Sequence, residues 1–177
     1  MRLMRRKIDD FLKEWKENED RLPLIVKGAR QIGKTASIMQ FANDNYKNVV
    51  AINFVLQQKF KSIFDDGYDV DSVVRNITLI DPSIELEPGN TIFFFDEMQD
   101  CPVCATSLKA FKIDGRYDVV CSGSLMGINY QEIESNSVGY KEDYTMHSMD
   151  FEEFLWAKGY DSAFVERLFE KMVSVTP

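Results

Sequence analysis

The chain has 177 residues, of which 45% are hydrophobic, and it carries a formal net charge of −8 at neutral pH. This length is enough for one full-sized hydrophobic core, and the negative charge argues against a general nucleic-acid-binding surface, which needs clustered Lys and Arg. No apolar stretch approaches the ~20 residues that span a bilayer, and the N-terminus lacks the apolar segment of a signal peptide. We therefore expect a cytoplasmic protein without a membrane partner.

The first predicted element is an amphipathic helix within residues 1–20. Its apolar positions follow the i, i+3, i+4, i+7 spacing of one helix face, at Ile8, Phe11, Leu12 and Trp15. A basic cluster comes just before, at Arg2, Arg5, Arg6 and Lys7. We interpret this cluster as a solvated tail or helix face in preference to a nucleic-acid-binding arm.

Residues 28–35 have the pattern Gly-x4-Gly-Lys-Thr, which is typical of a phosphate-binding loop. An apolar run at 22–26 predicts a buried strand before the loop, and the spacing of 36–42 predicts a helix after it. Glycines allow backbone N–H groups to turn inward toward a triphosphate, and the start of the helix also favours an anion. Lys34 would reach the β- and γ-phosphates, and Thr35 would place its hydroxyl on Mg²⁺. The predicted nucleotide-binding residues are Gly28, Ala29, Arg30, Gln31, Ile32, Gly33, Lys34, Thr35 and Ala36.

The middle of the chain predicts a second strand at 48–54, helical segments around 60–64 and 70–77, and a third strand at 91–97. The third strand is continuously apolar until it ends in Asp96 and Glu97, which is typical of a central strand in a parallel sheet. We expect Asp96 to hold Mg²⁺ through water, and Glu97 to orient and polarise the attacking water molecule.

The three cysteines are Cys101, Cys104 and Cys121. Cys101 and Cys104 have the spacing of a redox dithiol or half of a zinc site, but a second cysteine pair is missing and His147 is the single histidine. We therefore interpret them as loop and helix residues. Pro102 predicts the start of a helix that ends near Gly115.

A fourth strand is predicted at 117–124, where it runs into Ser122 and Ser124. Two interpretations stay open for these serines: a hydroxyl that contacts the γ-phosphate or the attacking water, and a tight Ser-Gly-Ser turn. A last strand is predicted near 143–146, followed by amphipathic helices at 151–157 and 163–172. The acidic residues at 152 and 153 fit the first turn of a helix, and we do not interpret them as a catalytic pair. Alternating strands and helices predict an α/β fold with a mainly parallel sheet.

Four segments taken in order, at 27–35, 95–99, 121–125 and 149–155, resemble a known family. They are similar to the prokaryotic AAA-type ATPases of the AAA+ superfamily, in which an N-terminal P-loop domain precedes a C-terminal domain of unknown function. The resemblance implies a three-layer AAA+ fold, with an N-terminal helix at 1–20, an ATPase core at 21–150 and C-terminal helices at 151–177. It also implies binding of ATP and ADP, and Mg²⁺-dependent hydrolysis coupled to an unknown partner.

Carried over by position, the catalytic residues would be Lys34, Glu97, Ser122 and Ser124, and the metal ligands Thr35 and Asp96. The chain departs from the family in stopping at Pro177 without a second domain, so we expect a fragment, an engineered piece or a shortened product of the gene of a larger ATPase. The expected protein partner is the missing C-terminal domain or another copy of the chain in a homo-oligomer. It also lacks the expected proline before Val138, and it has no arginine between Leu125 and Tyr140. The substitutes considered for that arginine are Arg30, Arg75, Arg116 and Lys141.

Alternatives to an ATP-driven motor therefore remain. They are a nucleotide-binding module with little turnover in isolation, a small-molecule kinase, and a nucleic-acid-associated ATPase. The scarcity of arginine late in the chain argues against the kinase, and only the basic N-terminus favours the nucleic-acid-associated enzyme.

Overall fold

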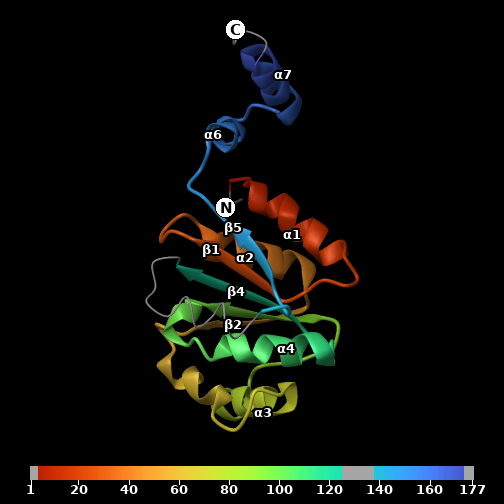
Figure 1. The fold of residues 1–177 in the computed structure, drawn as a ribbon, viewed down its shortest axis with the longest axis vertical. Helices are drawn as coiled ribbons and strands as arrows, with labels where there is room; N and C mark the ends of the chain where they lie inside the picture. Colours follow the sequence, from red (N-terminus) through yellow and green to blue (C-terminus); the bar gives the residue numbers. More distant parts are fainter. Residues whose placement is uncertain (1–3, 125–137, 174–177) are drawn as a thin grey trace.

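The computed structural model describes residues 4–124 and 138–173, in which a five-stranded sheet lies between two layers of helices (Figure 1). Each strand pairs with its neighbours in parallel, in the order β2-β3-β4-β1-β5. The strands are β1 (Leu24–Gly28), β2 (Asn48–Asn53), β3 (Thr91–Asp96), β4 (Asp118–Ser124) and β5 (Glu142–Thr145). The predicted α/β fold with its parallel sheet is confirmed.

Strand β3 lies between β2 and β4, and all six of its residues are buried. This central position explains its uninterrupted apolar sequence, because both faces of the strand are covered by helices. In a parallel sheet the carboxyl ends of the strands meet at one edge, and the register pairs Asn53 with Asp96 there, and Gly28 with Ser124. The predicted site residues on three strands are thus brought to the same edge.

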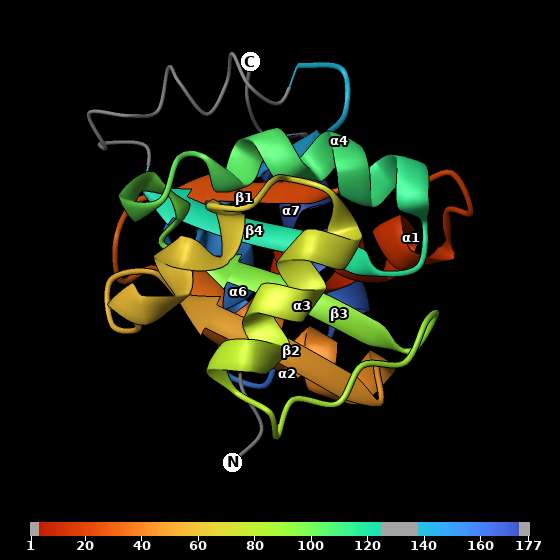
Figure 2. The same cartoon turned by 90° about the horizontal axis from the view of Figure 1, so that it is seen from below.

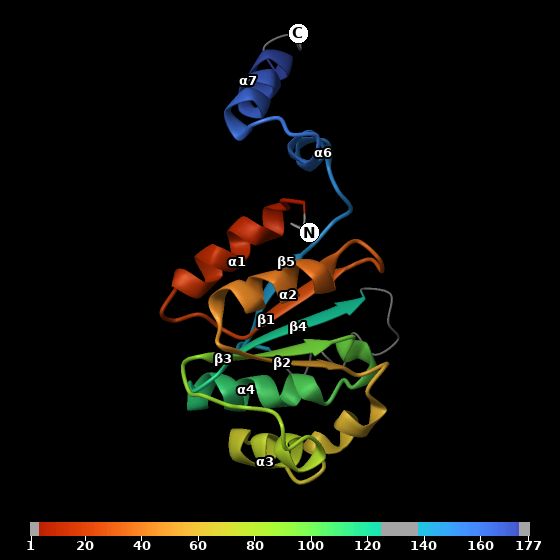
Figure 3. The same cartoon turned by 180° about the vertical axis from the view of Figure 1, so that it is seen from behind.

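Helices α1 (Lys7–Glu17) and α2 (Lys34–Asn45) cover one face of the sheet, and α3 (Val70–Ile80) and α4 (Cys104–Asp114) cover the other (Figures 2 and 3). The side chains of β3 alternate between two hydrophobic cores. Phe93 and Phe95 belong to the core beneath α3 and α4, whereas Phe94 lies in the core beneath α1 and α2.

Two predicted helices differ in detail. The segment around Phe60 is a 3₁₀ helix, Gln58–Phe64, which buries the predicted apolar residues against the larger core. Helix α4 begins at Cys104, two residues after Pro102, and it is preceded by the short 3₁₀ turn Met98–Asp100. It ends as predicted at Gly115, whose φ of 72° is the left-handed conformation common at helix ends.

The three cysteines are buried around α4 and β4 as free thiols. Burial raises the pKa of the Cys101 thiol to about 11, and it raises the pKa of Cys104 well above its ordinary value. The thiols of Cys101 and Cys104 therefore stay protonated at neutral pH and pack as small apolar groups.

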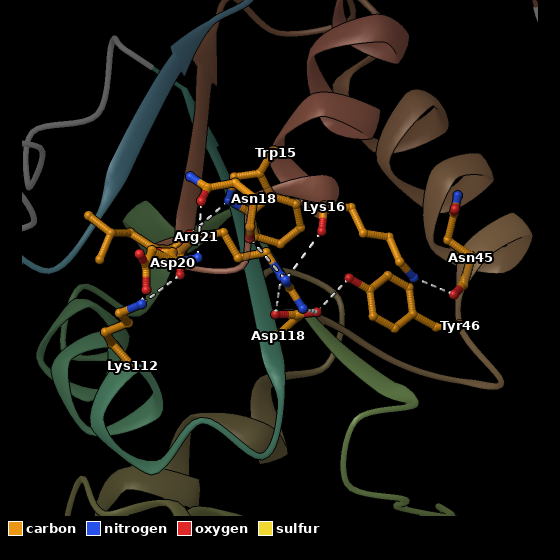
Figure 4. A network of polar contacts seen from close by, with 10 residues as sticks. Trp15, Lys16, Asn18, Asp20, Arg21, Asn45, Tyr46, Lys112 and Asp118 are labelled. Carbon is orange, nitrogen blue, oxygen red and sulfur yellow. Dashed lines mark hydrogen bonds and ion pairs between the residues drawn. The ribbon is translucent and has the colours of Figure 1, made fainter.

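At the amino edge of the sheet, opposite the predicted site, polar contacts centre on Asp118 (Figure 4). The Arg21 guanidinium donates two hydrogen bonds to its carboxylate, at 2.8 and 2.9 Å, and the Tyr46 hydroxyl donates a third at 2.7 Å. Lys112 on α4 donates to the backbone carbonyls of Asp20 and Arg21. This network connects the ends of α2 and α4 to the segment that enters β1.

After β5 the chain forms helices α6 (Phe151–Ala157) and α7 (Ser162–Val173), which extend beyond the layer of α1 and α2 (Figure 1). Asp150 and Glu153 form a reciprocal capping box at the start of α6, so the acidic residues lie in the first turn as predicted. Among the helices of residues 4–124 and 138–173, none is both long and apolar enough to cross a membrane.

Candidate nucleotide-binding site

The loop between β1 and α2 requires its two glycines for different reasons. Gly33 has a φ of 96° where it caps α2, a backbone conformation that residues with a Cβ rarely adopt. A Cβ on Gly28 would lie 2.4 Å from the carbonyl oxygen of Met146 and 2.7 Å from Cδ1 of Ile32. The loop therefore starts where β1 passes very close to the residue that follows β5.

Lys34 directs its ammonium group back into this loop, and the residue is only 7% exposed. Its Nζ donates hydrogen bonds to the carbonyl oxygens of Gly28, at 3.1 Å, and of Ala29, at 2.5 Å. Burial lowers the pKa of Lys34, and the nearby carboxylates of Glu97 and Asp96 oppose that effect. The arrangement places a cation inside the loop, where a phosphate group would meet it.

The carboxylate of Asp96 is the polar centre of the site and is 5% exposed. Its Oδ2 accepts hydrogen bonds from Thr35 Oγ1, at 3.1 Å, and from Asn53 Nδ2, at 3.0 Å. Its Oδ1 accepts from the Ser122 hydroxyl and from the backbone N–H of Glu97. A buried carboxylate is stabilised by such donors, so Asp96 holds α2, β2 and β4 around one charge.

Thr35 and Asp96 offer the hard oxygen atoms that Mg²⁺ prefers. The structure has no group of three or more His, Cys, Asp or Glu side chains arranged as metal ligands within residues 4–124 and 138–173. Such a cluster is not needed, because Mg²⁺ is commonly held by one or two carboxylates, substrate phosphates and several waters. The Thr35 hydroxyl and the Asp96 carboxylate, whose oxygen atoms lie 3.1 Å apart, are therefore the residues that could hold a magnesium ion.

Glu97 follows β3 in a left-handed conformation, with a φ of 57°, and its side chain is partly exposed. Its carboxylate accepts a hydrogen bond from the side-chain amide of Gln99. The carbonyl oxygen of the same amide accepts the backbone N–H of Ser124 at 3.1 Å. The candidate water-activating group is thereby connected to the end of β4.

Ser122 and Ser124 both lie inside β4, which runs to Ser124, so the Ser-Gly-Ser turn interpretation is wrong. Ser122 contacts Asp96, and Ser124 lies beside Gly28 in the strand register. Of the other predicted loop residues, Ala29, Arg30, Gln31 and Ala36 are exposed and Ile32 is partly buried. Leu125 lies outside the described residues.

The interpretation of the basic N-terminus as solvated is wrong for Arg6, which is 8% exposed. Its guanidinium donates to the carbonyl oxygens of Ile32 in the loop and His147 after β5, both at 2.9 Å. Its Nε lies 3.2 Å from Oε1 of Glu153 on α6. Arg6 therefore connects the phosphate-binding loop to the C-terminal helices.

The neighbouring cations are also engaged. Arg5 pairs with Asp10, whereas Lys7 pairs with Asp150 and Glu152. These contacts leave the described part of the cluster facing carboxylates of the same chain, which is unlike a surface arranged for a nucleic-acid backbone. Arg2 lies outside the described residues.

The four cations that could replace the missing arginine differ in their contacts. Arg116 is engaged by Asp71 and Asp114, and Lys141 pairs with Asp143. Arg75 is exposed on α3, and Arg30 is exposed in the loop itself. Most of the arginine-free stretch, residues 125–137, lies outside the described part of the chain.

Three residues of the candidate site, Asn53, Gln99 and Arg6, were not predicted from the sequence. The sequence pattern around Asn53 could have indicated its role, because Asn53 is the polar residue at the end of β2, which pairs with β3. Gln99 was included in the family resemblance but was given no role. Arg6 had no local signal, since its partners at Ile32 and His147 are 26 and 141 residues away along the chain.

Comparison with known families decides the assignment of the chain. The family model described as AAA domain (AAA_14) matches residues 20–155. The chain belongs to the AAA domain family. The resemblance to AAA-type P-loop proteins is thus confirmed, and the chain is an AAA-domain P-loop NTPase with a nucleotide-binding fold.

An uncharacterized protein of Haemophilus influenzae is 24% identical to the chain over 154 residues. The match covers 85% of this chain but 36% of that relative, so this chain spans about a third of the relative's length.

Solved structures are similar to the chain only in the general course of the backbone. C. elegans PCH-2 has a TM-score of 0.48 at 13% identity, covering 80% of this chain and 42% of that one. The Aeropyrum pernix ORC1 protein, solved in complex with DNA, has a TM-score of 0.47 at 12% identity, covering 78% and 43%. At this distance the likeness says nothing about function.

Proposed function

We propose that this AAA domain binds ATP with Mg²⁺ at the loop 28–35 and hydrolyses it. The observation that carries the proposal is the meeting of Thr35 and Asp96, whose oxygen atoms lie 3.1 Å apart although the residues come from α2 and β3. A P-loop lysine, Lys34, lies beside them. This is the arrangement that phosphoryl-transfer sites use to hold the phosphates and the metal ion.

Each residue would then have a distinct role. Lys34 would exchange the carbonyl oxygens of Gly28 and Ala29 for phosphate oxygens, which carry full negative charge and are stronger acceptors. Thr35 and Asp96 would hold Mg²⁺, which neutralises charge on the β- and γ-phosphates. Glu97 would orient a water molecule toward the γ-phosphate and accept its proton.

The adenine preference follows from the family rather than from a base-reading motif. The guanine-reading Asn-Lys-x-Asp signature of GTPases is absent from the sequence, which supports ATP over GTP. We also propose that hydrolysis moves a partner, either a further domain or another copy of the chain. Arg6 offers a route for this coupling, because it contacts both the loop and Glu153 on α6.

Thermal unfolding tests the binding step. We expect Mg²⁺ with ATP or ADP to raise the melting midpoint and GTP to raise it less, since a ligand at a hundred times its Kd adds about 2.7 kcal/mol to the stability. Lys34→Ala should remove the shift, because the phosphates lose their principal cation. A shift of equal size in Lys34→Ala would show that nucleotide binds elsewhere.

Turnover tests the chemical step separately. We expect Glu97→Gln to keep the ATP-dependent shift in melting midpoint and to lose phosphate release, because an amide cannot accept the proton of water. General-base catalysis contributes about 10²- to 10⁴-fold, so the loss should be easy to measure. Equal loss of ATP affinity in Lys34→Ala and Glu97→Gln would contradict the assigned roles. Binding without turnover in the parent chain would instead favour the nucleotide-binding module.

A further inference from the structure

Gln99 is a buried side chain that spans the carboxyl ends of β3 and β4. Its amide nitrogen donates to the Glu97 carboxylate and lies 3.3 Å from Oδ2 of Asp100. Its amide oxygen accepts the backbone N–H of Ser124 at 3.1 Å. One planar group thus contacts a carboxylate on one side and the last residue of a core strand on the other.

The two partners require an amide. A carboxylate needs a donor and a backbone N–H needs an acceptor, and an amide supplies both from a single rigid plane. Glutamate at this position would place a second negative charge against Glu97, whereas leucine would fill similar space without either hydrogen bond. Asparagine is shorter by one methylene, so it cannot span the same two groups from the same backbone.

The backbone conformation of Glu97 shows why the bridge, the two hydrogen bonds of the Gln99 amide to Glu97 and Ser124, matters for the position of Glu97. A non-glycine residue with a φ of 57° adopts a disfavoured left-handed conformation, so contacts nearby must maintain it. The backbone N–H of Glu97 donates to Asp96 Oδ1, and its carbonyl oxygen accepts the N–H of Asp100. These bonds fix the turn, and the Gln99 amide is the group that fixes the direction of the carboxylate.

We propose that Gln99 is the positioning residue for Glu97: its amide holds the water-activating carboxylate at a set place relative to the end of β4. The proposal rests on the hydrolytic function proposed above and assigns Gln99 to the geometry of that step. A general base must lie within hydrogen-bond reach of the water it activates, and a misplacement of about 1 Å can cost 10²-fold in rate.

Gly123 provides independent support from the neighbouring strand. A Cβ at this position would lie 3.2 Å from Oε1 of Gln99 and 3.2 Å from Cγ of Met98. Its backbone is not left-handed, so the glycine serves close packing and not an unusual conformation. Strand β4 thus leaves room for the Gln99 amide at the position where it meets Ser124.

The test compares the full chain with Gln99→Leu, Gln99→Glu and Gly123→Ala, by steady-state hydrolysis of ATP with Mg²⁺ and by ATP affinity. We expect kcat to fall about 10- to 100-fold in both Gln99 variants, while Kd and KM for ATP stay near their parental values. Gly123→Ala should show a smaller fall in kcat, because it displaces the amide without removing it. Gln40→Leu on α2 is the matched control for exchanging an amide for leucine, and it should keep kcat.

The outcomes separate the two proposals. A parent chain that binds ATP but does not hydrolyse it overturns the hydrolytic function and the role of Gln99 with it. An active parent with unchanged or faster turnover in Gln99→Leu overturns only the positioning role. A parallel loss of ATP affinity and kcat in Gln99→Leu would also overturn it, since that pattern indicates general damage to the site.

A nucleotide-free readout reports on the bridge itself. In amide NMR spectra we expect Glu97→Ala to shift the side-chain amide of Gln99 and the backbone N–H of Ser124. The chemical shifts of both groups depend on the position of the Gln99 amide, and Ser124 is on β4 whereas the mutated residue follows β3. An unmoved Ser124 resonance would show that the bridge does not connect Glu97 to β4.

Discussion

Asp96 shows how one buried carboxylate organises the carboxyl edge of the sheet. Its two oxygens accept hydrogen bonds from side chains on α2, β2 and β4, so removing the charge affects three elements together. A buried ion is tolerated only when its hydrogen-bonding groups are satisfied, and groups of the protein itself supply the donors to Asp96. The same carboxylate is therefore a structural centre before any metal ion arrives.

Gly28 allows a test of how closely the loop must approach β5. We expect Gly28→Ala to lower the melting midpoint and to weaken ATP binding, because the new methyl group would overlap the Met146 carbonyl oxygen and the Ile32 side chain. The backbone there must move, which displaces the start of the phosphate-binding loop. Thermal unfolding with and without Mg²⁺ and ATP measures both effects.

Gly89→Ala is the matched control for that change. Gly89 has a φ of 79°, but nothing lies within 4 Å of a Cβ built on it. It should therefore lose only about 1–2 kcal/mol of stability through backbone strain, with normal ATP affinity. If Gly28→Ala behaved the same way as Gly89→Ala, the close approach to β5 would have no part in binding.

At the scale of elements, the junction of α1 and α6 contains a buried ion pair between Arg6 and Glu153, beside the exposed pairs of Lys7 with Asp150 and Glu152. Glu153 accepts the backbone N–H groups of Lys7 and Asp150 as well as facing the Arg6 guanidinium. Helix α6 is thus attached to the start of α1, and through Arg6 to the carbonyl of Ile32. The attachment is polar, and through Arg6 it contacts the loop 28–35.

We expect Arg6→Leu to destabilise the protein by about 3 kcal/mol or more, because it leaves the Glu153 carboxylate buried without its cation. The double variant Arg6→Leu with Glu153→Leu should lose less than the sum of the two single variants, which a double-mutant cycle of chemical unfolding measures. Lys7→Ala is the control: Lys7 is 45% exposed in its ion pairs, so its loss should cost at most about 1 kcal/mol. Strictly additive single effects would indicate that Arg6 and Glu153 act independently.

The order of elements could be predicted from the sequence, because each depends on local patterns. The 3.6-residue spacing of Ile8, Leu12 and Trp15 defines the buried face of α1, and the apolar run of β3 requires burial on both faces. The 3₁₀ character of residues 58–64 was not predictable in this way, because the same apolar spacing suits either type of helix.

The site was predictable only where its residues form contiguous motifs. Lys34, Thr35 and the pair at the end of β3 belong to motifs, and the structure brings them together. Asn53 and Gln99 act through partners 43 and 25 residues away, and these pairings exist only after the strand order is known. A polar residue at a strand end looks the same in sequence whether it faces solvent or a buried carboxylate.

On the scale of the whole molecule, the two edges of the sheet carry separate polar networks. The carboxyl edge holds the candidate nucleotide site around Asp96, and the amino edge holds the network around Asp118 (Figure 4). Since the strands are rigid and packed on both faces, a change at the amino edge should alter stability without changing the geometry of the site.

We expect Tyr46→Phe to lower the stability by about 1.5–3 kcal/mol, because Tyr46 donates its hydroxyl to the charged carboxylate of Asp118. The ATP-dependent rise in free energy of unfolding should match that of the parent chain at the same ligand concentration. Isothermal unfolding at several ATP concentrations separates the two quantities. A changed ATP affinity in Tyr46→Phe would show that the two edges are energetically coupled.

The buried cysteines have a practical consequence for following motions of the domain. Only the thiolate reacts rapidly with alkylating reagents, and burial both hides Cys104 and Cys121 and keeps the thiol of Cys104 protonated. Each modification of Cys104 or Cys121 therefore requires an opening in which α4 separates from β4, so the labelling rate of these two thiols measures how often that layer opens. The rate at which these cysteines are alkylated is thus a built-in measure of opening. A decrease in this rate when a ligand is bound would report how strongly the ligand stabilises the closed packing of α4 on β4.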